Sequence, residues 1–382
     1  MIILTVSLVI VALSFLLWKL PFFRNTGLKS WQVLSAFYLK LVVACVFFAV
    51  YNYSPAFQNQ SDSQAFYRSA AQFSAIAHDN FGDYARASFH IPVKSPEIRK
   101  KLDKIAYWNR PYDSFMPNDT RQTLILYSFV YLISFGSLPV MLVIANFLAF
   151  LGLFALFKTF RAVNISPLPA FIACFCIPST LFWSSGLLKE VWLLLFMGFT
   201  LYSAMRFFTT KHIRFAAFAL VWSIALLHVK IYIALCLLPL LALYAIRTQW
   251  RTVNAAALYG GACVLCIFVV IGAQWFGHFS VIEVLGEQRN TFIRMLEFQN
   301  HTSIILHHFN GSVVEFCTQL FVGLFNVALR PTVFDIQNTF MFFACLENVV
   351  IAALIVFGTI VWIQKRSPIS NYTMLTIVFV VA

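Results

Sequence analysis

Four ionisable residues stand at the predicted ends of apolar segments, where a membrane protein can bring a lipid headgroup and a water-soluble molecule together. They are Asp62, Lys189, Lys230 and Arg330. A carboxylate can take a proton from an attacking hydroxyl group, and Lys or Arg can bind a phosphate. These residue types therefore suit the transfer of a group from a lipid phosphate to an acceptor.

Asp62 is the first carboxylate after the second apolar segment, within the polar run QNQSDSQAFYR at 58–68. At that place it could act as the base for an acceptor hydroxyl. The alternative is that Asp62 caps a helix beginning at Ser63, because Asp is a common N-cap residue. Nearby, Tyr67 could stack on a sugar and Arg68 could support the site, although tyrosines at an interface are ordinarily membrane anchors.

Lys189 and Glu190 follow a Ser-Ser-Gly turn at 184–186, where one predicted helix ends and another begins. Ionisable residues at such depth are costly and usually mark a site or an internal ion pair. The N-terminus of the new helix adds partial positive charge and backbone N–H groups. Lys189 and this turn could therefore hold a phosphate.

Two further cations stand at similar predicted turns. His228 and Lys230 belong to one turn, and Arg330 precedes the last full apolar segment. We predict that Lys189, Lys230 and Arg330 together bind the phosphate of a lipid donor, and that His228 supports them. The alternative for each cation is to extend toward the interface or to pair with Glu190 or Glu347.

The elements that carry these residues are membrane helices. Of the residues, 61% are hydrophobic and 11% are charged, whereas a soluble protein has about 25% charged residues. The apolar blocks are about twenty residues long, which suits helices rather than the shorter alternating strands of a barrel. We predict an all-α, polytopic transmembrane bundle with full spans at 1–18, 31–53, 138–159, 166–184, 188–208, 213–229, 231–247, 254–276 and 339–363. The shorter segment 122–137 suits a dipping or interfacial helix.

The distribution of charge predicts the topology. Loops rich in Lys and Arg stay in the cytoplasm, and they do so here if the N-terminus is outside, which leaves all 14 acidic residues outside or at outer helix ends. We expect one transmembrane domain over 1–382 with external loops at 54–121 and 277–338. The apolar run 370–382 is too short to span, so we expect the natural protein to continue beyond it.

The first external loop contains an amphipathic segment, 95–108. Ile98, Leu102, Ile105 and Trp108 share one face of it, so we expect it to rest on the bilayer or on the bundle.

Other signals narrow the class of function. The net charge of +13 is explained mainly by the Lys and Arg residues of the predicted cytoplasmic loops. The sequence shows no basic groove for nucleic acid. The cysteines lie mostly in predicted spans, as small buried hydrophobic residues do. His301 and His308 are one heptad apart and could share a helix face toward a divalent metal ion, but we predict no cofactor. Phosphate-binding loops of nucleotide-driven pumps are absent from the sequence.

The early acidic residue of the first loop, the turn LFWSSGLLKE at 181–190 and the LRP segment at 329–331 before Leu346-Glu347-Asn348 resemble the GT-C type of polytopic membrane glycosyltransferase. The resemblance implies a bacterial inner-membrane enzyme of cell-envelope polysaccharide biosynthesis. It would move a sugar from a polyprenyl-phosphate donor to a glycan, lipid or protein acceptor with inversion. Asp62 would be its catalytic base.

Three alternatives stay open. An O-antigen or exopolysaccharide polymerase or ligase would depend on Arg330 and the second loop more than on Asp62. A transporter of lipid-linked glycans would need polar residues along the bundle, where Lys40 is nearly alone among charged residues. A non-catalytic subunit of an envelope complex would need none of these residues.

Overall fold

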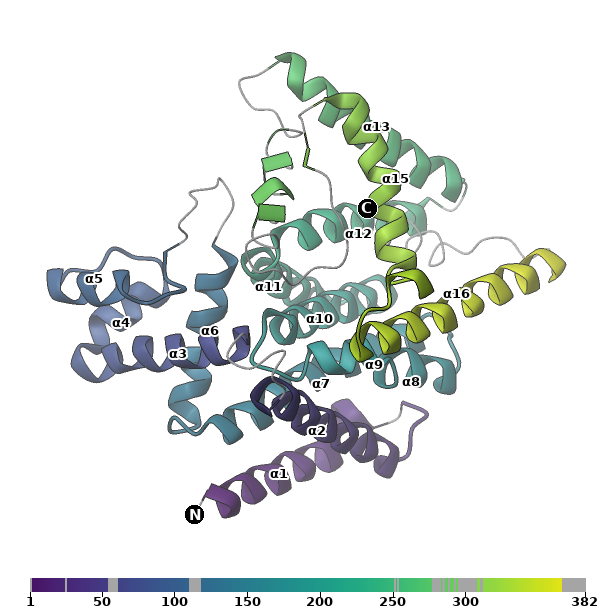
Figure 1. Ribbon diagram of the computed structural model, residues 1–382. Helices are drawn as coiled ribbons and strands as arrows, with labels where there is room; N and C mark the ends of the chain where they lie inside the picture. Colours follow the sequence, from purple (N-terminus) through teal and green to yellow (C-terminus); the bar gives the residue numbers. More distant parts are fainter. Residues whose placement is uncertain are drawn as a thin grey trace. The chain divides into compact units, whose positions relative to one another are not determined.

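The computed structural model describes residues 2–24, 26–53, 61–109, 118–250, 252, 254–276 and 312–365, together with some positions between 283 and 309. Every regular element in this part of the chain is helical, so the predicted all-α helical bundle is confirmed (Figure 1). The chain divides into two compact units, Met1–Leu238 and Pro239–Ala382, and the division falls inside one helix.

Unit 1 contains the following elements in chain order: α1 (Ile2–Lys19), η1 (Pro21–Phe23), α2 (Ser30–Tyr53), α3 (Asp62–Asp79), α4 (Phe81–Ser88), α5 (Pro96–Asp103), α6 (Asp119–Ile133), α7 (Leu138–Ala162), α8 (Pro167–Phe175), α9 (Pro178–Trp183), α10 (Lys189–Thr210), α11 (Ile213–Val229) and the first part of α12 (Ile231–Gln249). Unit 2 contains the rest of α12, then α13 (Ala255–Phe276), α15 (Val313–Leu329), η2 (Val333–Asp335) and α16 (Thr339–Lys365).

Several of these helices can cross a membrane, so the chain is a multi-pass membrane protein. Within the described residues, six helices are long and apolar enough to span: α1, α2, α7, α10, α12 and most of α16. Each coincides with a span predicted from the sequence. α11 has the predicted bounds 213–229 and α13 covers 255–276, and both include shorter apolar stretches.

The segment 166–184 is not one continuous helix, so this predicted span is wrong in form. It consists of α8 and α9, separated at Cys176 and Ile177. Pro178 begins α9. Proline lacks a backbone N–H and disfavours helical geometry in the residue before it, which explains the break.

The centre of unit 1 is the pair α7 and α10, which pack along one another. Gly152 and Gly198 meet where the two backbones approach most closely, because a Cβ on Gly198 would collide with the backbone of Gly152. Small residues allow this kind of approach between membrane helices. Around α7, aromatic side chains from α2 and α8 complete a buried cluster that includes Phe37, Phe150 and Phe175.

Helices α3, α4, α5 and α6, here called the α3–α6 segment (61–109 and 118–133), gather beside one another (Figure 1). The predicted amphipathic helix ends at Asp103, earlier than expected. Its apolar face is confirmed: Ile98, Leu102, Ile105 and Trp108 are all buried. Trp108 stacks on Phe73 of α3, with ring centroids 5.1 Å apart, so α5 and the residues after it pack onto the protein.

Unit 2 contains a helix within the range 277–338 that we predict as the second external loop. α15 has 17 residues and contains an apolar stretch at 314–327. It packs against α16, the last long apolar helix.

Candidate functional site

The turn Ser184–Leu188 joins α9 to α10 and is held by side chains from other helices. Lys40 of α2 is fully buried. Its Nζ donates to the Ser184 carbonyl at 3.0 Å and to Ser184 Oγ at 2.7 Å. Asn146 of α7, also fully buried, donates from Nδ2 to the Ser185 carbonyl at 2.9 Å. Both side chains therefore satisfy backbone groups that the helix break leaves without helical partners.

The second half of the turn is tied to the α3–α6 segment. The Leu187 N–H donates to Ser63 Oγ at 2.9 Å, and Tyr127 Oη donates to the Leu188 carbonyl at 2.7 Å. Gly186 lies against the Phe47 ring, where a Cβ would come within 2.5 Å of a ring carbon. These contacts fix the point at which α10 begins, and with it the positions of Lys189 and Glu190.

Lys189 is paired with the N-terminus of α6. Its Nζ lies 2.9 Å from Asp119 Oδ2 and 2.8 Å from Thr120 Oγ1. The side chains of Lys189 and Asp119 are only 22% and 16% exposed, so solvent screens this ion pair less than an exposed one. Asp119, which the sequence-based pairing with Glu190 or Glu347 did not include, is thus a partner of Lys189. Our sequence analysis did not single out Asp119, although its place at the start of an apolar segment was a usable signal.

Lys230 is the C-cap residue of α11 and lies within electrostatic range of Asp119 and Glu190. Burial by itself lowers the pKa of Lys230. A hydrogen bond with Tyr232 and the charges of Asp119 and Glu190 outweigh burial and raise the pKa above its usual range. Two of the three predicted cations, Lys189 and Lys230, therefore interact electrostatically with the same carboxylate, Asp119. We call Lys189, Lys230, Asp119 and Glu190 the lysine cluster.

His228 faces its own helix rather than this cluster. Its Nδ1 donates to the carbonyl of Ile224 at 2.8 Å, and the side chain is exposed.

Asp62 is the first residue of α3, and the helix cap is its neighbour. Ser61 is the N-cap residue, and its side chain accepts a hydrogen bond from the Ser63 N–H at 3.2 Å. The alternative that Asp62 caps a helix starting at Ser63 is therefore wrong. Ser performs this role as well as Asp does, because its short side chain reaches the same backbone N–H groups.

The Asp62 carboxylate is exposed and accepts a hydrogen bond from Tyr107 Oη at 2.8 Å. Burial raises the pKa of Tyr107, and the charge and hydrogen bond of Asp62 raise it further, so the phenol stays protonated and donates. The Tyr107 ring in turn packs on Phe66 of α3, with centroids 4.8 Å apart. This contact holds the phenol beside the carboxylate.

Asp62 is adjacent in sequence to Ser63, whose hydroxyl binds the turn two residues before Lys189. The predicted base and the lysine cluster are thus attached to the same turn. The supporting residues are directed elsewhere: Tyr67 donates to the Gly136 carbonyl at 2.8 Å, and Arg68 donates to Gln64 at 3.4 Å.

Arg330 belongs to unit 2, so its participation in this site stays a prediction. Its Nε lies 3.5 Å from Asp335 Oδ2, and its carbonyl accepts from Asn348 Nδ2 at 2.8 Å. Hydrogen bonds from Thr332 lower the pKa of Asp335, and the Arg330 charge lowers it further. Asp335, which our sequence analysis did not single out, is thus a charged partner for Arg330.

The part of the chain that the structure describes contains no group of three or more His, Cys, Asp or Glu side chains placed to hold a metal ion. Of the two histidines considered for such a site, His301 lies outside the described residues.

Comparisons with protein-family models, with curated proteins and with solved structures found no match for this chain.

Proposed function

We propose that this protein is a membrane glycosyltransferase that moves a sugar from a polyprenyl-phosphate donor to an acceptor at the membrane surface. The observation that carries the proposal is the position of Asp62. Its exposed carboxylate stands beside Ser63, which binds the turn leading to Lys189. A base for the acceptor and cations for the donor phosphate are thereby attached to one structural element.

In the proposed reaction, Asp62 takes the proton of an acceptor hydroxyl as its oxygen attacks the anomeric carbon of the donor sugar. A new carbon–oxygen bond forms on one face of the sugar while the bond to the phosphate breaks on the other, which inverts the configuration. Tyr107 orients the carboxylate through its hydrogen bond to Asp62 Oδ1. The exposure of Asp62 leaves an approach for the acceptor.

The departing lipid phosphate carries additional negative charge, and the lysine cluster would stabilise it. Lys230 and Lys189 supply the positive charges, and Asp119 and Glu190 lie within electrostatic range of them. The phosphate would share these cations with the two carboxylates. The sequence predicts Arg330 as a further cation for the phosphate, and this role stays a prediction because Arg330 belongs to unit 2.

The test is sugar transfer by the full chain in proteoliposomes, with a panel of polyprenyl-phosphate sugars as donors. The two ends of α3 offer a matched pair of variants. Asp62→Asn removes the proposed base, and Asp79→Asn makes the same change at the other end, where Asp79 is exposed and pairs with Lys101. We expect Asp62→Asn to lower the turnover by about 10² to 10⁴, the usual contribution of a general base, and Asp79→Asn to leave turnover close to wild type.

Full turnover in Asp62→Asn, at equal expression, would reject Asp62 as the base. If the wild type transfers no sugar from any donor, the glycosyltransferase proposal itself fails. Polymerase or ligase activity would then be tested with lipid-diphosphate glycans and Arg330→Gln, and transport with the same glycans sealed inside vesicles.

A further inference from the structure

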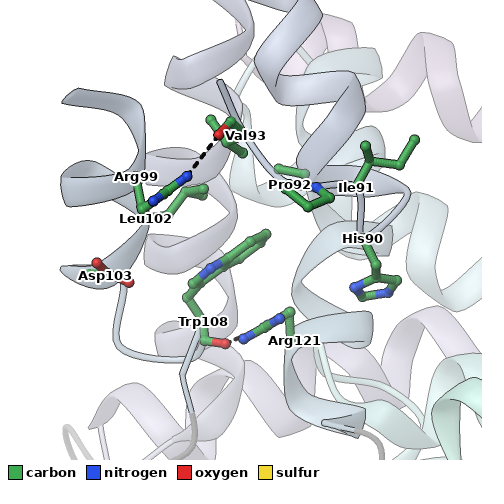
Figure 2. Close-up of a pocket in the computed structure, with 10 residues that line it drawn as sticks. His90, Ile91, Pro92, Val93, Arg99, Leu102, Asp103, Trp108 and Arg121 are labelled. Carbon is green, nitrogen blue, oxygen red and sulfur yellow. Dashed lines mark hydrogen bonds between the residues drawn. The ribbon is translucent and has the colours of Figure 1, made fainter. Parts of the chain in front are cut away.

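A pocket of about 270 Å³ lies in the α3–α6 segment, between the connection that follows α4, helix α5 and the first turn of α6 (Figure 2). We call it the Trp108 pocket. Leu102 and Trp108 contribute apolar surface, while Arg99, Arg121 and His90 bring nitrogen atoms to its wall. Neither Asp62 nor a member of the lysine cluster lines it.

The two arginines are held in place by the protein. Arg121 lies over the Trp108 ring, with Cζ 4.7 Å from the centroid, and its Nε donates to the Trp108 carbonyl at 2.6 Å. Arg99 donates from Nη2 to the Val93 carbonyl at 3.1 Å. Figure 2 shows the two guanidinium groups on either side of the Trp108 side chain. Fixed guanidinium groups bind oxyanions well because little side-chain entropy is lost when the ligand arrives.

The balance of charge in the Trp108 pocket is positive. Among the described residues, Asp103 is the one carboxylate on its wall, against Arg99 and Arg121. One oxygen of Asp103 accepts from Asn109 Nδ2 at 2.9 Å. Arg121 is partly buried, and burial lowers its pKa although the Asp103 charge opposes this. The partly buried Arg121 guanidinium has lost some of its contacts with water. An anion bound in the pocket would compensate for this loss.

The surroundings of Trp108 limit how a ligand can bind. Phe73 stacks on the indole, with centroids 5.1 Å apart, and the Arg121 guanidinium also lies over it. A sugar ring is therefore not expected to stack flat on Trp108, and recognition must depend on charge. The volume of about 270 Å³ is just below that of common small-molecule sites, about 300 to 1,000 Å³, so one ring-sized group fits better than an oligosaccharide.

We propose that the Trp108 pocket binds the carboxylate or phosphate oxyanion of a single ring-sized polar group, through Arg99 and Arg121. The proposal does not depend on the glycosyltransferase reaction. The pocket and the lysine cluster are nevertheless connected, because the first turn of α6 carries both Asp119, which binds Lys189, and Arg121. A ligand in the pocket thus lies close to the proposed reaction site, as an acidic sugar of an acceptor would.

The test is calorimetric titration of the purified full chain in detergent with D-glucuronate, D-glucose 6-phosphate and neutral D-glucose. We expect saturable binding of at least one of the two anions and none of glucose. Arg99→Gln should weaken that binding by about tenfold or more, because a charge-assisted contact is lost. Arg99→Lys, which keeps the charge, should retain part of it.

Lys100→Gln is the matched control, because Lys100 is the exposed neighbour of Arg99 on α5 and does not line the pocket. It removes the same charge and should leave the binding unchanged. Equal weakening in both variants would mean that general charge rather than the pocket attracts the anion, and would overturn the proposal. So would unchanged binding in Arg99→Gln, or no saturable binding of either anion in the wild type.

A second arm separates a soluble ligand from a lipid headgroup. The anion titrations are repeated in nanodiscs of phosphatidylcholine and of phosphatidylglycerol. Equal affinity in both identifies a soluble sugar acid or sugar phosphate as the occupant. If phosphatidylglycerol competes with the anions, and Arg99→Gln but not Lys100→Gln relieves this competition, the occupant is a lipid phosphate. Either result supports an oxyanion site at Arg99.

Discussion

The α7–α10 pair and the α3–α6 segment use their residues in different ways. In the pair, glycines bring two backbones together, and the buried Asn146 is bonded to neighbouring carbonyl groups. In the α3–α6 segment, Asp62 and Arg99 are exposed, although each has a defined hydrogen-bond partner. The polar groups of the first region hold the protein together, whereas those of the second can also meet a ligand.

This difference shows how the chain can combine membrane stability with chemistry. The turn before α10 lies between the two regions and is bonded to both, through Asn146 of α7 and through Ser63 and Tyr127 of α3 and α6. A rigid turn of this kind can hold exposed charges in fixed positions.

The largest expected effect on stability is at the α7–α10 contact. In Gly198→Ala the added Cβ would collide with the Gly152 backbone, so the helices must separate. We expect a loss of about 3 kcal/mol or more in the free energy of unfolding, at or beyond the usual upper range for overpacking. The measurement is unfolding of the full chain in detergent.

The matched control for that variant is Gly260→Ala in α13, where nothing lies within 4 Å of the added Cβ. It should be neutral or stabilising, because alanine favours a helix more than glycine does. Equal destabilisation by the two substitutions would contradict close packing of α7 on α10.

A smaller effect is expected at two tyrosine hydroxyls that make bonds of similar length. Tyr127 Oη binds the Leu188 carbonyl at 2.7 Å in a fully buried place, whereas Tyr67 Oη binds the Gly136 carbonyl at 2.8 Å in a partly buried place. We expect Tyr127→Phe to cost about 2 kcal/mol and Tyr67→Phe less than about 1 kcal/mol. Water cannot replace the lost donor at the buried Leu188 carbonyl, which keeps a longer contact of 3.4 Å from the Val191 N–H. Denaturant unfolding of both variants measures the difference. The reverse order would show that the turn before α10 does not depend on this bond.

The smallest expected effect is a change of stability with pH at Asp83 of α4. Its carboxylate accepts from the backbone N–H groups of Lys94 and Ser95 at 3.1 and 3.3 Å. In the folded protein the pKa of Asp83 is lowered, mainly by a hydrogen bond with Ser95, whereas burial acts in the opposite direction. A lowered pKa stabilises the fold above the unfolded value of about 3.9. That stability is lost as the pH falls through the folded pKa.

We therefore expect the advantage of wild type over Asp83→Asn to stay constant from about pH 7 to about pH 4 and to shrink as the pH is lowered further, through the folded pKa of Asp83. Thermal unfolding of both proteins at constant ionic strength measures this. An advantage that also stays constant at the lower pH values would show that the Asp83 charge does not hold the connection between α4 and α5.

Local patterns were enough for much of the fold. Bilayer-length apolar runs predicted the six helices that are long and apolar enough to span among the described residues, and the buried face of 95–108 followed from its periodicity. The sequence reasoning failed at Pro178, where it ran one helix through a break. It also missed Ser61, because the alternative role that it gave Asp62 placed the helix cap one residue too late. Both failures concern helix ends, where the choice between neighbouring residues depends on a few hydrogen bonds.

The sequence by itself determined that this chain is a helical membrane protein, because the cost of unpaired backbone groups in lipid acts on each apolar run separately. Only the tertiary structure decided which polar groups meet. Lys40 reaches Ser184 across 144 positions, and Lys189 reaches Asp119 across 70. Such pairs depend on how the helices pack and on where a helix breaks. The periodicity of residues within a single helix predicts neither the packing nor the break.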